Sequence, residues 1–551
     1  MGAVCGGSLN RPLSTEKKAI DKEVLGGGIY FCDRQLIKRR HPRPPVVSKY
    51  ASTTIQSGAA CYNVDADTKR KSRLKSIGSE NLLNQKSNHN ASDEVERPAL
   101  AVTAGTTQLA FASAQSDSKG FVEDSDLQLL NKNYALYRDF RNNGVNNGGK
   151  DTDQNYRNEW AHGVMATYAS GYTQGTVGFG VDAHAAQGFK LNSGDGTNGT
   201  GLLPIDGEGR AEDDYSYAGG AVKMRVSNTE LKYGNLMPTA PVFATSTARL
   251  LPASAEGFQL LSSEIENLSL DAGHFTAIRD GSMSTNSDGE ISTSYAGVTA
   301  DNADYLGGSY SLSDNLSLSL YGAELEDVWR QYYANANYSI PFSDEQSLTF
   351  DFNLYRTLDE GSAKAGDIDN TAFSLSAAYT LGAHTFTLAH QRVNGDEPLD
   401  YIMMDGFNYG DSIFLANSVQ YSDFNGPGEK SFQARYDLDM SAFGVPGLSF
   451  MARYITGSDA DGTGADRDGA YWNTDEDTGL PTTPGYGEDG KEWERDLQVK
   501  YVFQEGAAKD LSITVRQATW RSNNDMGWAY SGGSSALDEV RVITEYPLDI
   551  L

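Results

Sequence analysis

Four aspartates in one glycine-rich segment could bind a hard metal ion. The segment SDADGTGADRDG runs from Ser458 to Gly469 and carries Asp459, Asp461, Asp466 and Asp468. Carboxylate oxygens are the ligands that Ca²⁺ prefers. Their spacing differs from that of an EF-hand loop, and acidic residues are also common in solvent-exposed loops. A calcium site therefore stays an alternative to a loop that is simply acidic.

Residues suited to nucleophilic catalysis are present but form no motif. His274, Asp327 and Ser412 could make a serine hydrolase triad only if the fold brought them together. No serine of the chain lies in a G-x-S-x-G sequence, and the seven His and three Cys show no zinc-binding spacing. We therefore predict that the protein is not an enzyme and uses no cofactor.

The charge of the chain is strongly acidic and unevenly distributed. The formal net charge is −29, yet residues 1–97 hold 17 Lys or Arg against 10 Asp or Glu, which leaves 28 against 64 for the rest. An acidic body repels the phosphates of nucleic acids. We therefore expect no nucleic acid among the partners of this protein.

The first 96 residues differ from the rest in composition. All three cysteines (Cys5, Cys32 and Cys61) lie there, and the 490 residues that follow have none. A body without cysteine suits export to a compartment where thiols are oxidised. Residues 1–96 lack hydrophobic periodicity and include the basic stretch KRRHPRPP at 38–45. We predict that they are disordered or spurious.

A segment resembling a signal peptide follows. Residues 99–114 read ALAVTAGTTQLAFASA, a small and weakly apolar core that ends in the cleavage pattern Ala-Ser-Ala. We assign residues 97–114 to this segment and expect Gln115 to begin the mature protein, 115–551. Such a core normally follows a short basic stretch after the initiator Met, so we interpret residues 1–96 as a wrongly extended reading frame. A genuine long leader or cytoplasmic extension is the alternative.

The remaining sequence alternates between apolar and polar residues. It has no run of 18 apolar residues, so no transmembrane helix is expected. In DLQVKYVFQE (496–505) the residues Leu497 and Val499 oppose Gln498 and Lys500. The segments LTFDFNLYRT (348–357) and SFQARYDLDM (431–440) follow the same pattern. From about residue 121 onward, such segments alternate with turns that contain Gly, Asn, Asp or Ser, which predicts β-strands.

Alternation alone fits a soluble β-sandwich as well as a membrane barrel. Two observations favour the barrel. Short turns such as 313–315 alternate with long polar loops such as 458–490, as periplasmic turns and extracellular loops do. Tyrosines are abundant near the ends of the expected strands, as in the aromatic girdles of membrane proteins; they include Tyr332, Tyr333, Tyr338, Tyr355, Tyr379 and Tyr454. We predict an all-β transmembrane antiparallel β-barrel.

Several segments resemble the OprD family of outer-membrane porins. The resemblance covers about residues 99–551 and is most specific in DSIFLANSVQYSDFNGPGEKS at 411–431. Further matching segments are GFVEDSDLQLL (120–130), SGYTQGTVGFGVDA (170–183), MPTAPVFA (237–244), SLYGAELEDVWRQYY (319–333) and EYPLDIL (545–551).

The resemblance implies an 18-stranded barrel in the outer membrane of a Gram-negative bacterium, with inward-folded constriction loops. It implies passive, selective uptake of small solutes that carry a carboxylate. One branch of the family favours basic amino acids, small peptides and carbapenems, and another favours cyclic or aromatic carboxylates. The implied partners are outer-membrane lipid and the outer-membrane assembly machinery. A surface-binding β-barrel adhesin is the alternative from a different functional class.

By the same resemblance, one wall of the pore carries a ladder of basic side chains. A substrate carboxylate would pass from one cation to the next, because several equivalent charge-assisted contacts prevent trapping at any one of them. Alternation independently places Lys500 opposite apolar neighbours, and a lipid-facing lysine would cost about 2–4 kcal/mol near the midplane. The alternative for each cation is a solvated or interfacial charge. The matching positions are Arg138, Arg157, Arg249, Lys500, Arg516 and Arg541.

The resemblance also implies an electronegative pocket opposite the ladder, suited to the cationic end of a basic amino acid. The retained tyrosines and Asp423 favour the basic amino-acid branch, although Asp423 could instead cap a turn. Pro238, Pro241 and Pro252 flank the expected constriction loop, where their fixed φ stiffens the chain. The matching pocket residues are Tyr295, Tyr401, Ser418, Tyr421 and Asp423.

Thr514 departs from the family pattern, since near relatives often carry a second arginine two residues before the one at Arg516. We predict a weaker anion track at this position. Replacing Thr514→Arg adds a cation next to the ladder and should strengthen the response of single-channel currents to carboxylate substrates. An unchanged response in recordings that compare the two proteins would contradict this prediction.

Overall fold

The structure is a computed structural model that describes residues 114–141, 154–194, 196–284, 290–403, 411–475, 478–527 and 534–551. The interpretations of residues 1–96 and of nearly all of the segment 97–114 lie outside these ranges. Within them, no helix is both long and apolar enough to cross a membrane.

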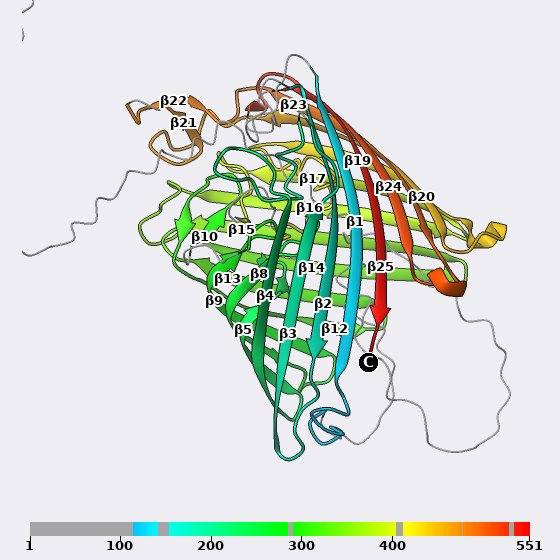
Figure 1. Cartoon of the computed structure of the whole chain (residues 1–551). Coiled ribbons are helices and arrows are strands. Elements are labelled where there is room, and N and C mark those ends of the chain that lie inside the picture. Colours follow the sequence, from blue (N-terminus) through cyan, green and yellow to red (C-terminus); the bar gives the residue numbers. More distant parts are fainter. Residues whose placement is uncertain are drawn as a thin grey trace, which may run out of the picture. The chain divides into compact units, whose positions relative to one another are not determined.

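Eighteen antiparallel strands form one closed barrel (Figure 1). Each strand pairs with the next barrel strand along the chain, and the first pairs with the last, from Gln128 opposite Asp549 to Phe140 opposite Leu537. Closure leaves no unpaired sheet edge, which a bilayer requires. The barrel strands are β1 (Asp126–Phe140), β2 (Tyr156–Ala169), β3 (Val177–Lys190), β4 (Asp214–Val226), β5 (Thr229–Leu236), β8 (Ser254–Ser262), β9 (Leu268–Arg279), β12 (Ala303–Ser313), β13 (Leu316–Leu325), β14 (Trp329–Ser343), β15 (Gln346–Asp359), β16 (Asp369–Leu381), β17 (His384–Asn394), β19 (Lys430–Asp439), β20 (Leu448–Ala460), β23 (Gly490–Val502), β24 (Ser512–Ser522) and β25 (Ala536–Asp549).

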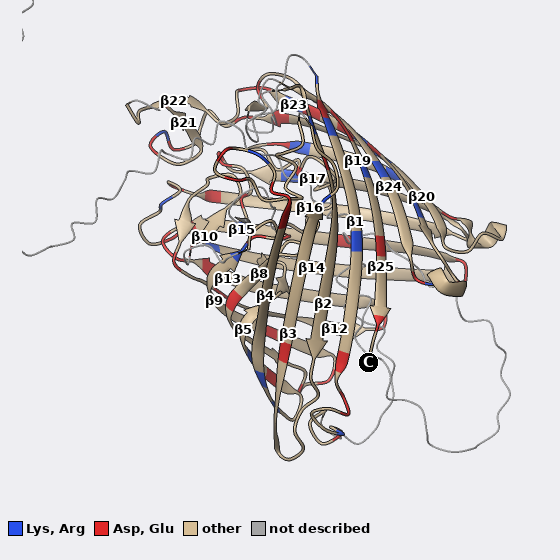
Figure 2. Ribbon diagram, viewed as in Figure 1, with Lys and Arg blue, Asp and Glu red and all other residues tan. Residues whose placement is uncertain are grey.

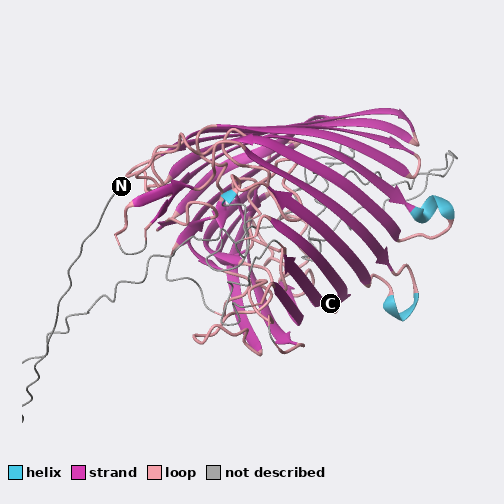
Figure 3. Ribbon diagram, turned by 90° about the horizontal axis from the view of Figure 1, so that it is seen from above, coloured by secondary structure: helices cyan, strands magenta, loops and turns pink. Residues whose placement is uncertain are grey.

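Shorter elements lie in the connections between the barrel strands. Figure 3 shows that loops gather inside the ring of strands. Among the residues that the structure describes, the short strands form three small sheets and two 3₁₀ helices lie in turns. These elements are β6 (Thr239–Ala240), β7 (Phe243–Ala244), β10 (Ile291–Thr293), β11 (Thr299–Ala300), β18 (Ile402–Met403), β21 (Trp472–Thr474), β22 (Pro481–Pro484), η1 (Met440–Phe443) and η2 (Gly506–Ala508).

The wall of the barrel is apolar outside and polar inside, the reverse of a soluble protein. On β23, Leu497 and Val499 are 44% and 40% exposed on the outer side, whereas Asp496 and Gln498 are buried on the inner side. Lys500 shares the inner side, two residues beyond Gln498. The predicted alternation is confirmed, and it follows from the two-residue period of a strand between lipid and lumen.

The tyrosines divide between the two sides of the wall. Tyr332, Tyr338, Tyr379 and Tyr454 are exposed on the outer side, as the girdle interpretation predicts. The prediction is wrong for Tyr333 and Tyr355, which are buried inside the barrel. The hydroxyl of Tyr333 donates to Asn353 Oδ1 at 2.6 Å, so this side chain takes part in the hydrogen bonds inside the barrel.

Two long segments fold into the barrel and narrow it. Residues 237–253 connect β5 to β8, and residues 411–429 follow β18 and lead to β19. Nearly all of their side chains are buried. We call them the first and the second constriction loop. The expectation of inward-folded loops in an 18-stranded barrel is confirmed.

Because the outer side of the wall is apolar and the inner side polar, a lysine should destabilise the protein more on the outer side than on the inner side. Leu388 on β17 is 68% exposed on the outer side, and Leu388→Lys should lower the free energy of unfolding in lipid vesicles by about 2–4 kcal/mol if it lies near the bilayer midplane. Thr167, exposed on the inner side of β2, gives the matched control Thr167→Lys, which should cost far less. Urea titrations followed by tryptophan fluorescence measure both, and equal losses would refute the assignment of the two faces.

Candidate functional site

The two constriction loops are bound to each other and to the wall by buried hydrogen bonds. The hydroxyl of Tyr355, on β15, donates to the carbonyl of Pro241 at 3.0 Å and accepts from the Phe414 N–H at 3.0 Å. The Ala244 N–H donates to Ser412 Oγ at 2.7 Å. One wall tyrosine thus fixes both loops in the lumen.

The structure brings the six predicted cations to one part of the barrel. Five lie on the adjacent strands β23, β24, β25, β1 and β2, and Arg249 lies on the first constriction loop. Arg138 stands opposite Arg157 in the register of β1 and β2, and Arg516 stands opposite Arg541 in that of β24 and β25. Figure 2 shows basic segments on β1 and β24 and acidic segments on β25 between them.

Arg138 and Arg541 share one carboxylate. Glu539 accepts from Arg138 Nε at 2.9 Å and Nη2 at 2.7 Å, and from Arg541 Nε at 2.6 Å. The side chains of all three residues are almost completely buried. One of the two positive charges is therefore balanced within the wall rather than by solvent.

Arg157 and Arg249 bind a third loop, which belongs to the connection between β3 and β4. Arg157 Nη1 donates to the Gly199 carbonyl at 2.7 Å, and Arg249 Nε donates to the Thr200 carbonyl at 2.9 Å. Glu159 accepts from the N–H groups of Thr200 and Leu202 at 3.1 and 3.3 Å. These two arginines are as deeply buried as Arg138 and Arg541.

Arg516 and Lys500 keep more contact with the lumen. Arg516 is 7% exposed and donates to Gln498 Oε1 at 2.6 Å, and Lys500 is half-buried. Thr514 points to the same side and stands opposite Lys500 in the register of β23 and β24. An arginine at position 514 would therefore enter a group of cations.

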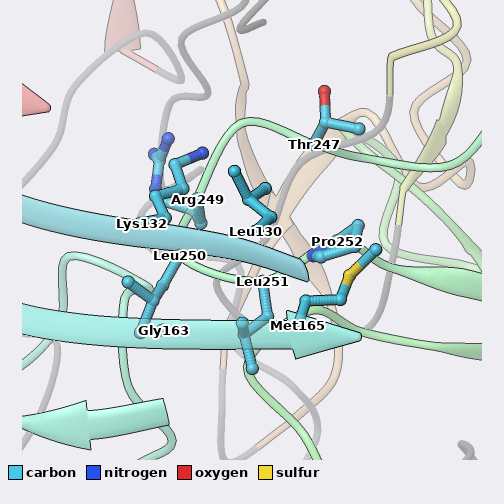
Figure 4. A pocket seen from close by; sticks show the side chains of 9 residues that line it. All are labelled: Leu130, Lys132, Gly163, Met165, Thr247, Arg249, Leu250, Leu251 and Pro252. Carbon is cyan, nitrogen blue, oxygen red and sulfur yellow. The ribbon is translucent and has the colours of Figure 1, made fainter. Parts of the chain in front are cut away.

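Sequence reasoning missed Lys132. This lysine lies six residues before Arg138 on the same side of β1, and its Nζ lies 3.5 Å from Glu545 Oε1. It lines a small cavity together with Arg249 (Figure 4). The apolar part of the cavity is formed by Leu130, Met165, Leu250, Leu251 and Pro252. The sequence could have predicted that Lys132 faces the lumen, because the two-residue alternation of β1 places Lys132 and Arg138 on one side of the strand.

Three further buried arginines, Arg279, Arg435 and Arg453, were not singled out. Arg435 on β19 and Arg453 on β20 stand opposite each other in register. Arg435 Nη2 lies 2.7 Å from Asp437 Oδ1, and Arg453 Nε lies 2.6 Å from Asp496 Oδ2. They extend the charged interior along the wall from β23, each with its own carboxylate.

The predicted electronegative pocket converges on Asp423. Its carboxylate accepts from Tyr295 Oη at 2.9 Å, Tyr401 Oη at 2.8 Å and Ser418 Oγ at 2.6 Å. Asp423 is completely buried. Burial raises the pKa of its carboxyl to about 6, although the three hydroxyl donors oppose this shift.

Tyr421 takes a different place from the other pocket residues. Its ring packs at a tilt against Trp520, with centroids 4.9 Å apart, and lies 5.5 Å from the guanidinium of Arg138. Its backbone N–H donates to Glu494 Oε1 at 2.8 Å. Tyr421 therefore lies between the cationic wall and the Asp423 pocket, on the loop that carries both Ser418 and Asp423.

The structure does not bring the hydrolase candidates together. His274 Nδ1 lies 2.8 Å from Asp304 on the outer side of the barrel, whereas Ser412 Oγ is hydrogen bonded to Ala244 inside it. Asp327 lies in the turn after β13 and accepts from the Ser362 N–H.

The aspartates of the 458–469 segment have local partners. Asp459 pairs with Lys430 at 2.8 Å, and Asp461 and Asp466 accept from N–H groups two residues later. Within the described ranges, no group of three or more His, Cys, Asp or Glu is arranged to hold a metal ion.

Comparison with known proteins gives consistent results. Residues 119–550 match the family model of the outer membrane porin, OprD family. Porin D of Pseudomonas aeruginosa is 55% identical over 464 residues, 82% of this chain and 98% of Porin D. The porin-like protein GalP of Pseudomonas putida is 32% identical over 438 residues, 79% of this chain and 95% of GalP.

Crystal structures that match the barrel include two from Pseudomonas aeruginosa. That of Pseudomonas aeruginosa OprD, 53% identical, matches with a TM-score of 0.65 over 80% of this chain and 100% of its own. That of Pseudomonas aeruginosa OpdK with vanillate, 34% identical, matches with a TM-score of 0.66 over 78% of this chain and 100% of its own. Together with the closed barrel and its inward-folded loops, these matches establish that the chain belongs to the OprD family of outer-membrane porins, as a non-enzymatic, substrate-selective channel for small solutes in a Gram-negative outer membrane.

Proposed function

We propose that the channel takes up basic amino acids and small peptides, with carbapenems as further substrates. The observation that supports this most is the convergence of Tyr295, Tyr401 and Ser418 on Asp423. The same loop contacts the cationic wall, since Arg541 Nη2 donates to the Gln420 carbonyl at 3.1 Å. A solute with a carboxylate at one end and a cation at the other has complementary groups at both sides of the constriction.

The six predicted cations and Lys132 would serve the carboxylate end. Each guanidinium or ammonium offers charge-assisted hydrogen bonds that offset part of the dehydration of the carboxylate. Arg516 and Lys500 are the more accessible of the predicted set. We infer that they contact the substrate first, whereas the buried arginines set the electrostatic potential and hold the loops.

Substrate uptake into proteoliposomes tests the proposed specificity. Vesicles with the purified porin should swell faster in arginine and lysine than in neutral amino acids of similar size. A preference for vanillate and related aromatic acids would overturn the proposal. If no solute changed the swelling rate or the current, the surface-binding alternative would replace it.

Uptake of aromatic carboxylates is the second candidate, because the cations Lys132 and Arg249 lie beside the apolar side chains of Leu250 and Leu251. The cavity that they line is too small for an aromatic acid. OpdK, 34% identical, was solved with vanillate. The higher identity to Porin D, together with the Asp423 pocket, favours the basic amino-acid assignment.

Removing the charge of Asp423 tests the pocket. Asp423→Asn keeps the side-chain volume but loses a charged acceptor, whose hydrogen bonds contribute roughly 1.5–3 kcal/mol each. Half-saturation of arginine-dependent current should then require at least about tenfold more arginine. Asp437→Asn, next to Arg435 and away from the pocket, is the control and should change it little. Equal effects of the two variants would contradict a specific role of Asp423.

The same residue predicts a pH dependence. Because the pKa of Asp423 is raised to about 6, its carboxyl is ionised at pH 7.5 and becomes neutral as the pH falls through 6. Arginine affinity should therefore fall between pH 7 and 5, and Asp423→Asn should remove most of this dependence. A titration of arginine-dependent current checks this. An equal slope in the variant would assign the effect to other groups, such as the buried carboxyl of Asp400, whose pKa is also raised to about 6 by burial.

Cleavage after Ala114 is supported by the contacts of the residue that would follow it. The Gln115 N–H donates to the Ser227 carbonyl at 3.1 Å, and its side chain bonds to Thr173 and Arg225. The first residue of a mature chain of 115–551 would thus be held against the barrel, with residues 97–114 as the leader and 1–96 as a disordered or spurious extension. Mass spectrometry of the outer-membrane protein decides this, and an N-terminus before residue 97 would reject it.

The exposed apolar outer wall supports contact with outer-membrane lipid. Insertion of such a wall requires a route that shields it from water, so we infer that the outer-membrane assembly machinery is the second partner.

A further inference from the structure

Glu539 occupies a central place in the cationic wall. It lies on β25 with no exposed side-chain surface and stands opposite Arg138 in the register with β1. Arg541 lies two residues further along the same face, and its Nε contacts Glu539 at 2.6 Å. One carboxylate therefore contacts two cations on two strands.

Glu539 is also linked to the second constriction loop. Gln420 Nε2 donates to Glu539 Oε1 at 3.2 Å, and the Gln420 carbonyl accepts from Arg541 at 3.1 Å. The residues that follow, Tyr421 and Ser422, donate their N–H groups to Glu494 at 2.8 Å each. Ser422 Oγ also donates to Glu492 Oε1 at 2.8 Å, so the loop that carries Asp423 rests on three wall carboxylates. Of these, Glu539 is the one that contacts Arg138 and Arg541 within the described part of the chain.

We propose that Glu539 is a specificity-determining residue of the channel. By compensating Arg138 and Arg541, it keeps the potential of the constriction low enough for cationic solutes to pass beside the arginines. Without this charge, two guanidinium groups on neighbouring strands would act together in a region of low dielectric, where fields are strong. The constriction would then exclude cations and favour anions.

The proposal concerns ion selectivity and rests on the porin fold, not on the proposed amino-acid substrate. Glu539 acts through the arginines and the loop, so it is a positioning residue as well as a source of charge. The two roles can be separated, because Glu539→Asp keeps the charge but shortens the side chain by one methylene.

Reversal potentials in a KCl gradient across a planar bilayer test the proposal. Dilute salt is required, since the Debye length is about 10 Å at 0.1 M. Glu539→Gln should raise the chloride-to-potassium permeability ratio roughly twofold or more. Arg541→Gln should lower it, and the double variant Glu539→Gln/Arg541→Gln should return close to the wild-type ratio. Glu539→Asp should resemble the wild type.

Three outcomes would overturn the proposal. These are an unchanged ratio in Glu539→Gln, a double variant no closer to the wild type than Glu539→Gln, and a Glu539→Asp channel that behaves like Glu539→Gln. Heat-modifiable mobility on gels verifies folding before each recording. If Glu539→Gln does not fold, Arg541→Gln alone must be more cation-selective than the double variant, and equal ratios reject the role of Glu539. Currents carried by arginine are recorded separately, so failure of the substrate proposal stays distinguishable.

Discussion

The whole structure depends on one constraint: every polar group of the wall that cannot face lipid must be satisfied inside a closed barrel. Pairing of β1 with β25 satisfies the backbone of the last strand, and the two-residue period of each strand then separates apolar from polar side chains. This separation places Lys500 inside and Val499 outside. The pore is polar because polar side chains of the strands would be costly in the hydrocarbon of the bilayer and therefore face the lumen.

The constriction loops narrow the polar interior of the 18-stranded barrel. Buried hydrogen bonds to the wall hold these loops in place. Tyr355 binds both constriction loops through one hydroxyl, and Glu494 holds two consecutive N–H groups of the second loop. A buried carboxylate or hydroxyl without its partner would be costly, so each anchor favours a single loop position. Charge balance follows the same rule, because Arg138, Arg435, Arg453 and Arg541 each contact a wall carboxylate. The ion selectivity proposed for the channel depends on how far these carboxylates balance the neighbouring cations.

Local pattern was sufficient to predict the β-strands and the orientation of Lys500, since both depend only on alternation along one strand. The choice of a membrane barrel over a soluble sandwich also needed the lengths of the turns and loops and the tyrosines near the strand ends. The number of strands and the inward loops came from family resemblance, because closure of a barrel leaves no local signal. Tyr333 and Tyr355 were misassigned because tyrosines near strand ends occur on both faces, and position along the strand does not tell them apart. The link between Arg138 and Glu539 spans 401 residues and exists only because the first and last strands meet. Lys132 was visible in the alternation of β1, but motif matching passed over it.

Cysteine accessibility along β23 tests the central separation of faces most directly. In a protein whose native cysteines are replaced by serine, Lys500→Cys and Val499→Cys are each treated with a charged, membrane-impermeant thiol reagent while the current through a planar bilayer is recorded. The structure predicts that the reagent changes the current rapidly at position 500 and leaves it unchanged at position 499. Rapid modification at 499, or none at 500, would show that the cation faces the lipid and that the wall is oriented differently.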